Sequence, residues 1–133
     1  MKTREVERFK ATSSLKKAEE CKNSMLRAFE VGDWNSSLIN AIHCAISSAD
    51  ALCVNKLGLR NASERHEEAI VLFLRIDPNS EEIKKNANHL SGLLKIKTDA
   101  EYGERLFSEK HAEEAIKHAE RLFNFVKKRI TGI

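Results

Sequence analysis

The segment from residue 34 to residue 58 constrains the fold of this chain more than any other. Its apolar residues recur at steps of three and four positions, which is the period of an α-helix. Three of its alanines stand four positions apart, so one face is thin enough for a neighbouring helix to approach closely. Because few polar residues interrupt it, this helix must be buried on most sides. We therefore predict a central helix over about residues 35–55, which Gly58 ends.

Helical periodicity extends through most of the remaining sequence. The other helices are expected over about residues 4–31, 63–75 and 79–97, and from after Ser108 to about residue 130. The helix over residues 4–31 is expected to turn Phe9 inward. We expect Asn61 or Ser63 to cap the helix over residues 63–75, and Asp77 to cap the helix over residues 79–97. No segment shows strand alternation and no linker divides the chain. We predict an all-α fold, in which residues 1–133 form one domain: a four- to five-helix up-and-down bundle.

Composition indicates which partners and which cellular compartment to expect for this protein. The 23 basic and 20 acidic residues give a net charge of +3, too small to indicate nucleic-acid binding by charge alone. Three cysteines without a Cys-x-x-Cys spacing, Cys21, Cys44 and Cys53, are expected to be free thiols in a reducing compartment. The first ten residues are densely charged, and no apolar run approaches the roughly 20 residues of a membrane span. We expect a soluble, cytoplasmic protein without membrane contact.

An arginine and a histidine stand close together at the start of the predicted helix over residues 63–75. Arg60 and His66 are separated by five residues. An arginine that holds a phosphate and a histidine that moves a proton are the minimum equipment for cleaving RNA through its own 2′-hydroxyl. These two residues are therefore the candidate catalytic pair, and the alternative is an arginine near a helix cap beside an unrelated surface histidine.

Two further polar groups are candidate binding sites. Lys97, Asp99 and Tyr102 lie at the junction before the last helix, where lysine and a lone tyrosine could contact the phosphate of a nucleotide or RNA. The alternative is a turn whose tyrosine ring packs on the bundle. A second group, at steps of four and three along the central helix, consists of His43, Ser47 and Asp50. It forms a polar seam that could hold a ligand or only fix helix packing.

Metal and cofactor motifs are not found in the sequence. His111 and His118 lie on one helix face with Glu114, but about 10 Å apart along the axis, too far for one metal ion. This face is expected to be solvated. No phosphate loop or dinucleotide fingerprint is present. We predict no metal and no cofactor.

Weak motifs in a fixed order nevertheless resemble those of one family. They are Leu15-Lys-Lys-Ala18, Gly32-Asp33-Trp34, the alanine-rich helix ending at Leu57-Gly58, Ala69-Ile-Val-Leu-Phe73, Asp99-Ala-Glu-Tyr102 and Ala112-Glu-Glu-Ala-Ile-Lys-His-Ala119. Together they cover nearly the whole chain, which is similar to the HEPN domain, a small helical module found beside nucleotidyltransferases. The resemblance implies an all-α bundle, usually a homodimer, that acts on RNA or partners a nucleotidyltransferase.

The sequence departs from the family where nuclease members carry an arginine and a histidine near the start of a late helix. A related branch has an Arg-x-x-Ala-Asp-Tyr run in this region, and here Lys97 takes the place of its arginine. We therefore expect a non-catalytic HEPN-like homodimer that binds a nucleotidyltransferase partner, a nucleotide or RNA. One alternative is a metal-independent ribonuclease toxin of a toxin-antitoxin pair. Another is a structural adaptor of tetratricopeptide character, because Leu106–Ile116 weakly echoes the segment around Trp34.

Overall fold

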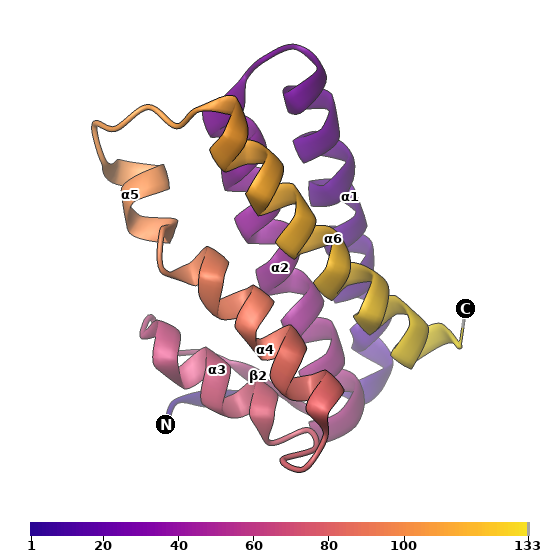
Figure 1. Ribbon diagram of the computed structural model, residues 1–133. Helices are drawn as coiled ribbons and strands as arrows, with labels where there is room; N and C mark the ends of the chain where they lie inside the picture. Colours follow the sequence, from indigo (N-terminus) through magenta and orange to yellow (C-terminus); the bar gives the residue numbers. More distant parts are fainter. Residues whose placement is uncertain (133) are drawn as a thin grey trace.

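A long apolar helix lies at the centre of the fold, and the other helices pack around it (Figure 1). This is α2 (Trp34–Leu57), seen in a computed structural model that describes residues 1–132. α1 (Ala11–Glu30) and α6 (Glu109–Thr131) make its main contacts, and α4 (Glu81–Leu94) packs on α6 and α2. The all-α bundle is confirmed, with long helices joined largely by short turns.

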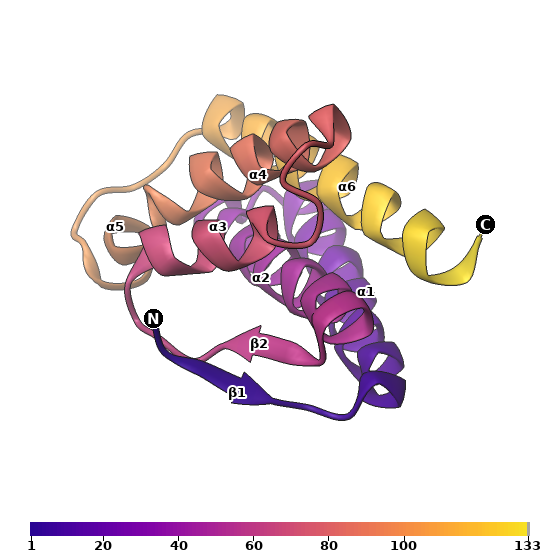
Figure 2. The same ribbon diagram turned by 90° about the horizontal axis from the view of Figure 1, so that it is seen from below.

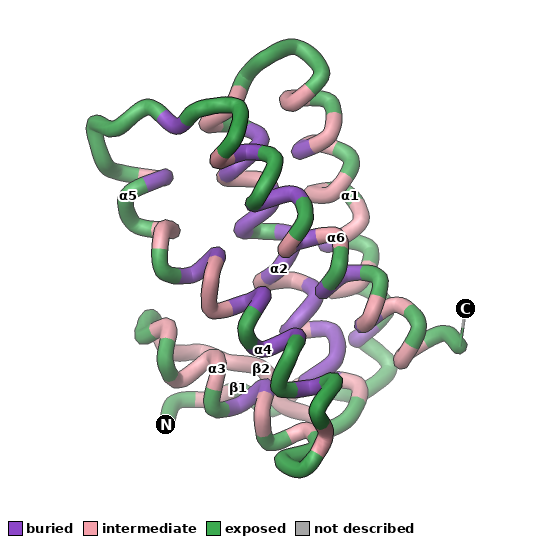
Figure 3. Tube along the Cα trace, in the orientation of Figure 1, coloured by how far each residue is buried: buried purple, intermediate pink, exposed green. Residues whose placement is uncertain are grey.

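Burial follows the apolar pattern of α2. Leu38, Ile42 and Leu52 are completely buried, and Figure 3 shows buried residues along most of this helix. α1 and α6 are each buried along one stripe only, since their outer faces are charged. A hydrogen bond adds specificity to the α1–α2 contact, because the buried Ser37 hydroxyl donates to the Met25 carbonyl at 2.9 Å. The core therefore lies between α2 and the helices on either side of it.

The structure corrects the prediction at the N-terminus, where the chain is not helical from residue 4. β1 (Thr3–Glu5) pairs antiparallel with β2 (Leu59–Asn61), and the two lie across the end of the bundle (Figure 2). A short 3₁₀ turn, η1 (Arg8–Lys10), then leads into α1. Phe9, which was expected to face inward, is 68% exposed.

The reason for this small sheet is the turn at Gly58. This residue ends α2 as predicted, and it has φ +69°, a left-handed conformation that glycine adopts without strain. The turn sends the chain back beside the N-terminal segment, where the amide of Val6 donates to the Gly58 carbonyl at 2.9 Å. Strands of three residues are too short to show the alternation of apolar and polar residues that identifies a strand in a sequence. The turn at Gly58 is what brings the two strands together.

The two caps predicted for the middle helices are also wrong. α3 (His66–Leu74) begins after Arg65, because Asn61 and Ser63 bond each other in the preceding loop: the Ser63 amide donates to Asn61 Oδ1 at 3.2 Å. The N-cap of α4 is Ser80, whose hydroxyl accepts from the Ile83 amide at 3.2 Å. Asp77 instead accepts from the Asn79 amide within the turn.

The junction before the last helix is itself helical. α5 (Lys97–Tyr102) is a separate six-residue helix, which the prediction had joined to the end of α4 or left as a turn. A loop then leads to α6, which begins after Ser108 and ends at Gly132, close to its predicted bounds. The stretch that echoes the tetratricopeptide pattern is this loop and the first turns of α6, not a second hairpin of two long helices.

The length and composition of α2 also correct the prediction about membrane spans. It is long and apolar enough to cross a membrane, with a mean hydropathy of 1.4 over its most apolar window. Two thirds of that window (67%) is buried inside the bundle, as in the core helix of a soluble protein. Cys44 and Cys53 on this helix are buried free thiols, and burial raises the pKa of each to about 12. Cys21 is a free thiol and half-buried.

Candidate functional site

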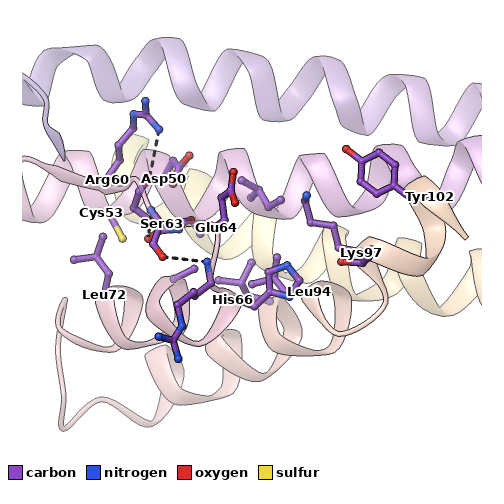
Figure 4. Close-up of a pocket in the computed structure, with 17 residues that line it drawn as sticks. Asp50, Cys53, Arg60, Ser63, Glu64, His66, Leu72, Leu94, Lys97 and Tyr102 are labelled. Carbon is purple, nitrogen blue, oxygen red and sulfur yellow. Dashed lines mark hydrogen bonds between the residues drawn. The ribbon is translucent and has the colours of Figure 1, made fainter. Parts of the chain in front are cut away.

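A pocket of about 550 Å³ opens between α2, the loop after β2, α3 and α5 (Figure 4). We call it the α2–α3–α5 pocket. Its size lies within the roughly 300–1,000 Å³ range of small-molecule sites. Apolar side chains contributed by α2, α3 and α4 line part of it: Ile46, Ala49, Ala69, Leu72, Leu90 and Leu94. Charged and polar side chains line the rest, so the pocket combines an apolar wall with groups that can orient a ligand.

The pocket brings together residues from all three of the candidate groups. Arg60, His66, Asp50, Lys97 and Tyr102 all line it. In Figure 4, Arg60 and Asp50 lie at one end and Lys97 and Tyr102 at the other. These residues lie between positions 50 and 102 of the sequence and on four different elements. The pocket is therefore the candidate functional site.

Arg60 is positioned by the small sheet. It lies in the middle of β2, opposite Arg4 of β1, and its Nη1 donates to the backbone carbonyl of Asn61 at 3.3 Å. In Figure 4 its side chain points away from His66. Within residues 1–132, no hydrogen bond joins the side chains of Arg60 and His66. The predicted catalytic pair thus shares one pocket without being in contact.

The start of α3 supplies the second set of groups. The Ser63 hydroxyl accepts from the Arg65 amide at 3.0 Å and donates to the Glu68 carboxylate, which fixes the loop before the helix. Arg65 and His66 follow directly and line the pocket, together with the exposed Glu64. The guanidinium of Arg65 is paired with the Glu67 carboxylate, to which its Nη2 donates at 3.2 Å. Because the N-terminal end of a helix carries a partial positive charge, it adds to the cationic side chains here.

α5 supplies the third set. Lys97 is 28% exposed at the rim, and the Tyr102 residue is 80% exposed. The tyrosine ring therefore does not pack on the bundle, which was the alternative interpretation. Asp99, the third member of this predicted group, does not line the pocket, since its carboxylate lies 3.8 Å from Arg105 on the outer side of the helix.

The conformation after α5 depends on a glycine. The Gly103 amide donates to the Asp99 carbonyl at 3.0 Å. A Cβ added at Gly103 would come within 2.6 Å of that carbonyl oxygen and 2.3 Å of Asp99 Oδ1. A side chain at this position would therefore displace the end of α5 and with it Tyr102.

Asp50 is the most perturbed acid in the pocket. It is half-buried, and burial raises the pKa of its carboxyl to about 6, although the positive charges of Arg60 and Lys17 act in the opposite direction. An acid with such a pKa changes its charge close to neutral pH. Ionising Asp50 in these surroundings therefore costs free energy, which makes this residue a candidate for a role in the site.

The three residues of the predicted polar seam all lie on α2, but only one of them belongs to the pocket. Only Asp50 lines the pocket. His43 is 46% exposed and lies 3.2 Å from the carboxylate of Glu101 on α5. Ser47 is half-buried between them and lines no part of the pocket. The three residues thus differ in surroundings, with His43 beside α5 and Asp50 in the pocket.

A second histidine pair lies outside the pocket. His89 of α4 is buried, and its Nδ1 lies 2.9 Å from Nδ1 of His118 on α6. Burial, and then the nearby His118, lower the pKa of His89. The solvated face predicted for α6 is therefore wrong at His118. His111 also has a structural role, since its ring completes a capping box with Ser108 at the start of α6.

Sequence reasoning missed two residues of this region. Glu101 lies four positions after Lys97, and its Oε2 is 3.4 Å from Lys97 Nζ. That spacing is the usual one for an ion pair on a helix and could have identified it. Arg65 gave no signal of its own, because its position depends on where α3 begins.

The chemistry of the pocket is that of a site for a polar, partly anionic molecule. Arg60, Arg65 and Lys97 are cationic, whereas Asp50 and Glu64 can accept hydrogen bonds from hydroxyl or amino groups. Within residues 1–132, no three or more histidine, cysteine, aspartate or glutamate residues are grouped so as to hold a metal ion.

Comparison with known proteins identifies the family. No curated protein matches the chain closely. A model of the HEPN domain matches residues 11–129, nearly the whole chain. This match agrees with the resemblance seen in the ordered motifs and with the all-α bundle, and the chain belongs to the HEPN domain family.

Proposed function

We propose that this HEPN domain binds a phosphorylated ribonucleoside in the α2–α3–α5 pocket, either as a free nucleotide or as part of an RNA chain. One observation carries the proposal. Cationic side chains from β2, the start of α3 and α5 line a single cavity that also has an apolar wall. A phosphate needs the first feature and a nucleoside needs the second.

The geometry supports a particular orientation of the ligand. In this proposal the phosphate lies near the start of α3, where His66 and Lys97 line the pocket beside the helix N-terminus. Hydroxyl and amino groups of the nucleoside are placed against Asp50, since a carboxylate accepts their hydrogen bonds. The exposed ring of Tyr102 offers a stacking surface for a base at the rim. Non-catalytic binding needs no contact between Arg60 and His66.

The first prediction concerns the charge of Lys97. Replacing it in Lys97→Gln removes a cation from the rim, and we expect the Kd for AMP or GMP to rise about 10- to 100-fold, because a charge-assisted hydrogen bond contributes about 1.5–3 kcal/mol. Titration calorimetry with the four ribonucleoside monophosphates, and with a short single-stranded RNA, measures this and shows which form of the ligand binds.

Lys95→Gln is the matched control. Lys95 is exposed, carries the same charge two positions earlier, and does not line the pocket. The Lys95→Gln variant should bind the same probes with the affinity of the unchanged protein. Equal losses in the two variants would mean that only overall charge matters, and an absence of binding to any of these probes by the unchanged protein would reject the proposal.

A second candidate function is metal-independent cleavage of RNA. The observation that favours it is that Arg60 and His66, the two residues that this chemistry requires, line the same pocket. Cleavage would need Arg60 to turn from its bond with the Asn61 carbonyl toward the phosphate. We rank this function second because the two side chains are directed apart (Figure 4).

Cleavage can be tested directly. Purified protein is incubated with single-stranded RNA in the presence of a chelator, alongside Arg60→Ala and His66→Ala. If this function is correct, the unchanged protein cleaves RNA and each variant loses at least about 100-fold in rate. Cleavage that survives both substitutions would point to a contaminating nuclease.

We also propose, from membership of the family, that the protein is a cytoplasmic homodimer that binds a nucleotidyltransferase. Exposed apolar side chains support an interface of this kind. Val31 is 72% and Leu106 is 84% exposed, and Leu106 lines a shallow hollow of about 310 Å³ beside Trp34. Light scattering of the protein, alone and mixed with the product of the neighbouring gene, tests both contacts.

A further inference from the structure

The short helix α5 is attached to the bundle in a way that bears on the pocket. Its six residues include Lys97 and Tyr102, which line the pocket, and Ala100, which is buried against the core. A helix of this length is not stable by itself, so contacts with the rest of the protein must hold it in place. Glu101 makes a polar contact with α2.

The carboxylate of Glu101 lies between two basic groups. The side chain is 14% exposed. Its Oε2 accepts from Lys97 Nζ at 3.4 Å within α5. Its Oε1 lies 3.2 Å from Nε2 of His43 on α2, at ion-pair distance but without the alignment of a hydrogen bond. Glu101 therefore connects the lysine at the pocket rim to the central helix.

We propose that Glu101 is a positioning residue, which holds Lys97 at the rim of the pocket while His43 holds Glu101 from α2. A lysine ammonium has three donors, so the bond to Glu101 leaves two for a ligand phosphate. A lysine that is already oriented loses less side-chain entropy when the ligand binds. The expected effect of Glu101 on nucleotide affinity rests on the proposed function. The attachment of α5 to the bundle can be tested without any ligand.

The ligand-free test is hydrogen exchange. In Glu101→Gln and His43→Leu, the amides of α5 should exchange about three- to tenfold faster than in the unchanged protein, because the polar contact with α2 is weakened or lost. Glu104→Gln, an exposed acid just after α5, is the control that leaves exchange unchanged.

The binding test is a double-mutant cycle with AMP as the probe. Glu101→Gln should weaken AMP binding about tenfold. The double variant Lys97→Gln/Glu101→Gln should bind AMP no more weakly than Lys97→Gln alone, because Glu101 acts through the lysine. A role in stability alone would make the two losses add.

The outcomes separate the two proposals. If α5 exchanges at the same rate in all these variants, Glu101 does not hold it and the inference is wrong. If exchange changes but the losses of AMP affinity are additive, Glu101 does not act through Lys97, and the inference is again wrong. If AMP and the other nucleotide probes do not bind the unchanged protein, the proposed function fails, and the exchange rates still decide whether Glu101 and His43 hold α5.

Discussion

Asp50→Asn should make the protein more stable at pH 7.5, by at most about 3 kcal/mol, and should have little effect at pH 4. The pKa of Asp50 is raised from 3.8 to about 6 by burial, so the folded protein holds this proton more tightly than the unfolded chain does. As the pH rises through about 4 to 6, the carboxyl ionises more readily in the unfolded chain, and the stability of the fold decreases. A shift of about two pH units corresponds to about 3 kcal/mol at most.

Urea unfolding at the two pH values measures this effect. Asparagine cannot ionise, so the variant avoids the cost that aspartate carries above pH 6. Glu104→Gln removes an exposed acid and should change stability little at either pH. A gain of equal size at both pH values would show that charge burial is not its cause. If Asp50 binds the ligand, the more stable variant should also bind nucleotide more weakly, a trade-off typical of functional sites.

Phe73→Ala should destabilise the protein by about 3–5 kcal/mol, the usual cost of deleting a buried aromatic ring. Phe73 is completely buried and fixes α3, a helix of nine residues, against the core. Because the start of α3 lines the pocket, the loss should also reduce nucleotide affinity at temperatures where the variant is still folded. Thermal and urea unfolding, followed by circular dichroism, give the change in stability.

Val71→Ala provides the comparison within the same helix. Val71 is 48% exposed, and its truncation should change stability by no more than about 0.5 kcal/mol. Similar unfolding midpoints for the two variants would mean that α3 is not held by its buried side. The contrast between them therefore tests the placement of α3, on which the geometry of the pocket depends.

The sequence predicts α2 and α6 well because each carries a continuous apolar pattern. α2 and α6 begin and end within about two residues of their expected positions. The small sheet could not be predicted, since β1 has three residues and pairs only because Gly58 turns the chain toward it. Likewise, the start of α3 depends on a loop in which Asn61 and Ser63 bond each other instead of the helix.

The candidate site was predictable as residues but not as an arrangement. Arg60, His66, Lys97 and Tyr102 are each recognisable from their chemistry and local spacing. Their convergence depends on how α5 and the β2–α3 loop fold over α2, which no local pattern encodes. For the same reason the sequence pattern grouped Asp50 with His43, which lies on the same helix face. In the structure His43 contacts α5, whereas Asp50 lines the pocket.

The pairing of β1 with β2 bears on where the protein can be cut. The family match begins at residue 11, and a fragment designed from that match would retain the long helices. It would also lack residues 3–5, whose backbone is paired with the strand that carries Arg60. Assays on such a shortened protein would therefore report on a pocket with one loosened wall, and a negative result from it would not describe the intact chain.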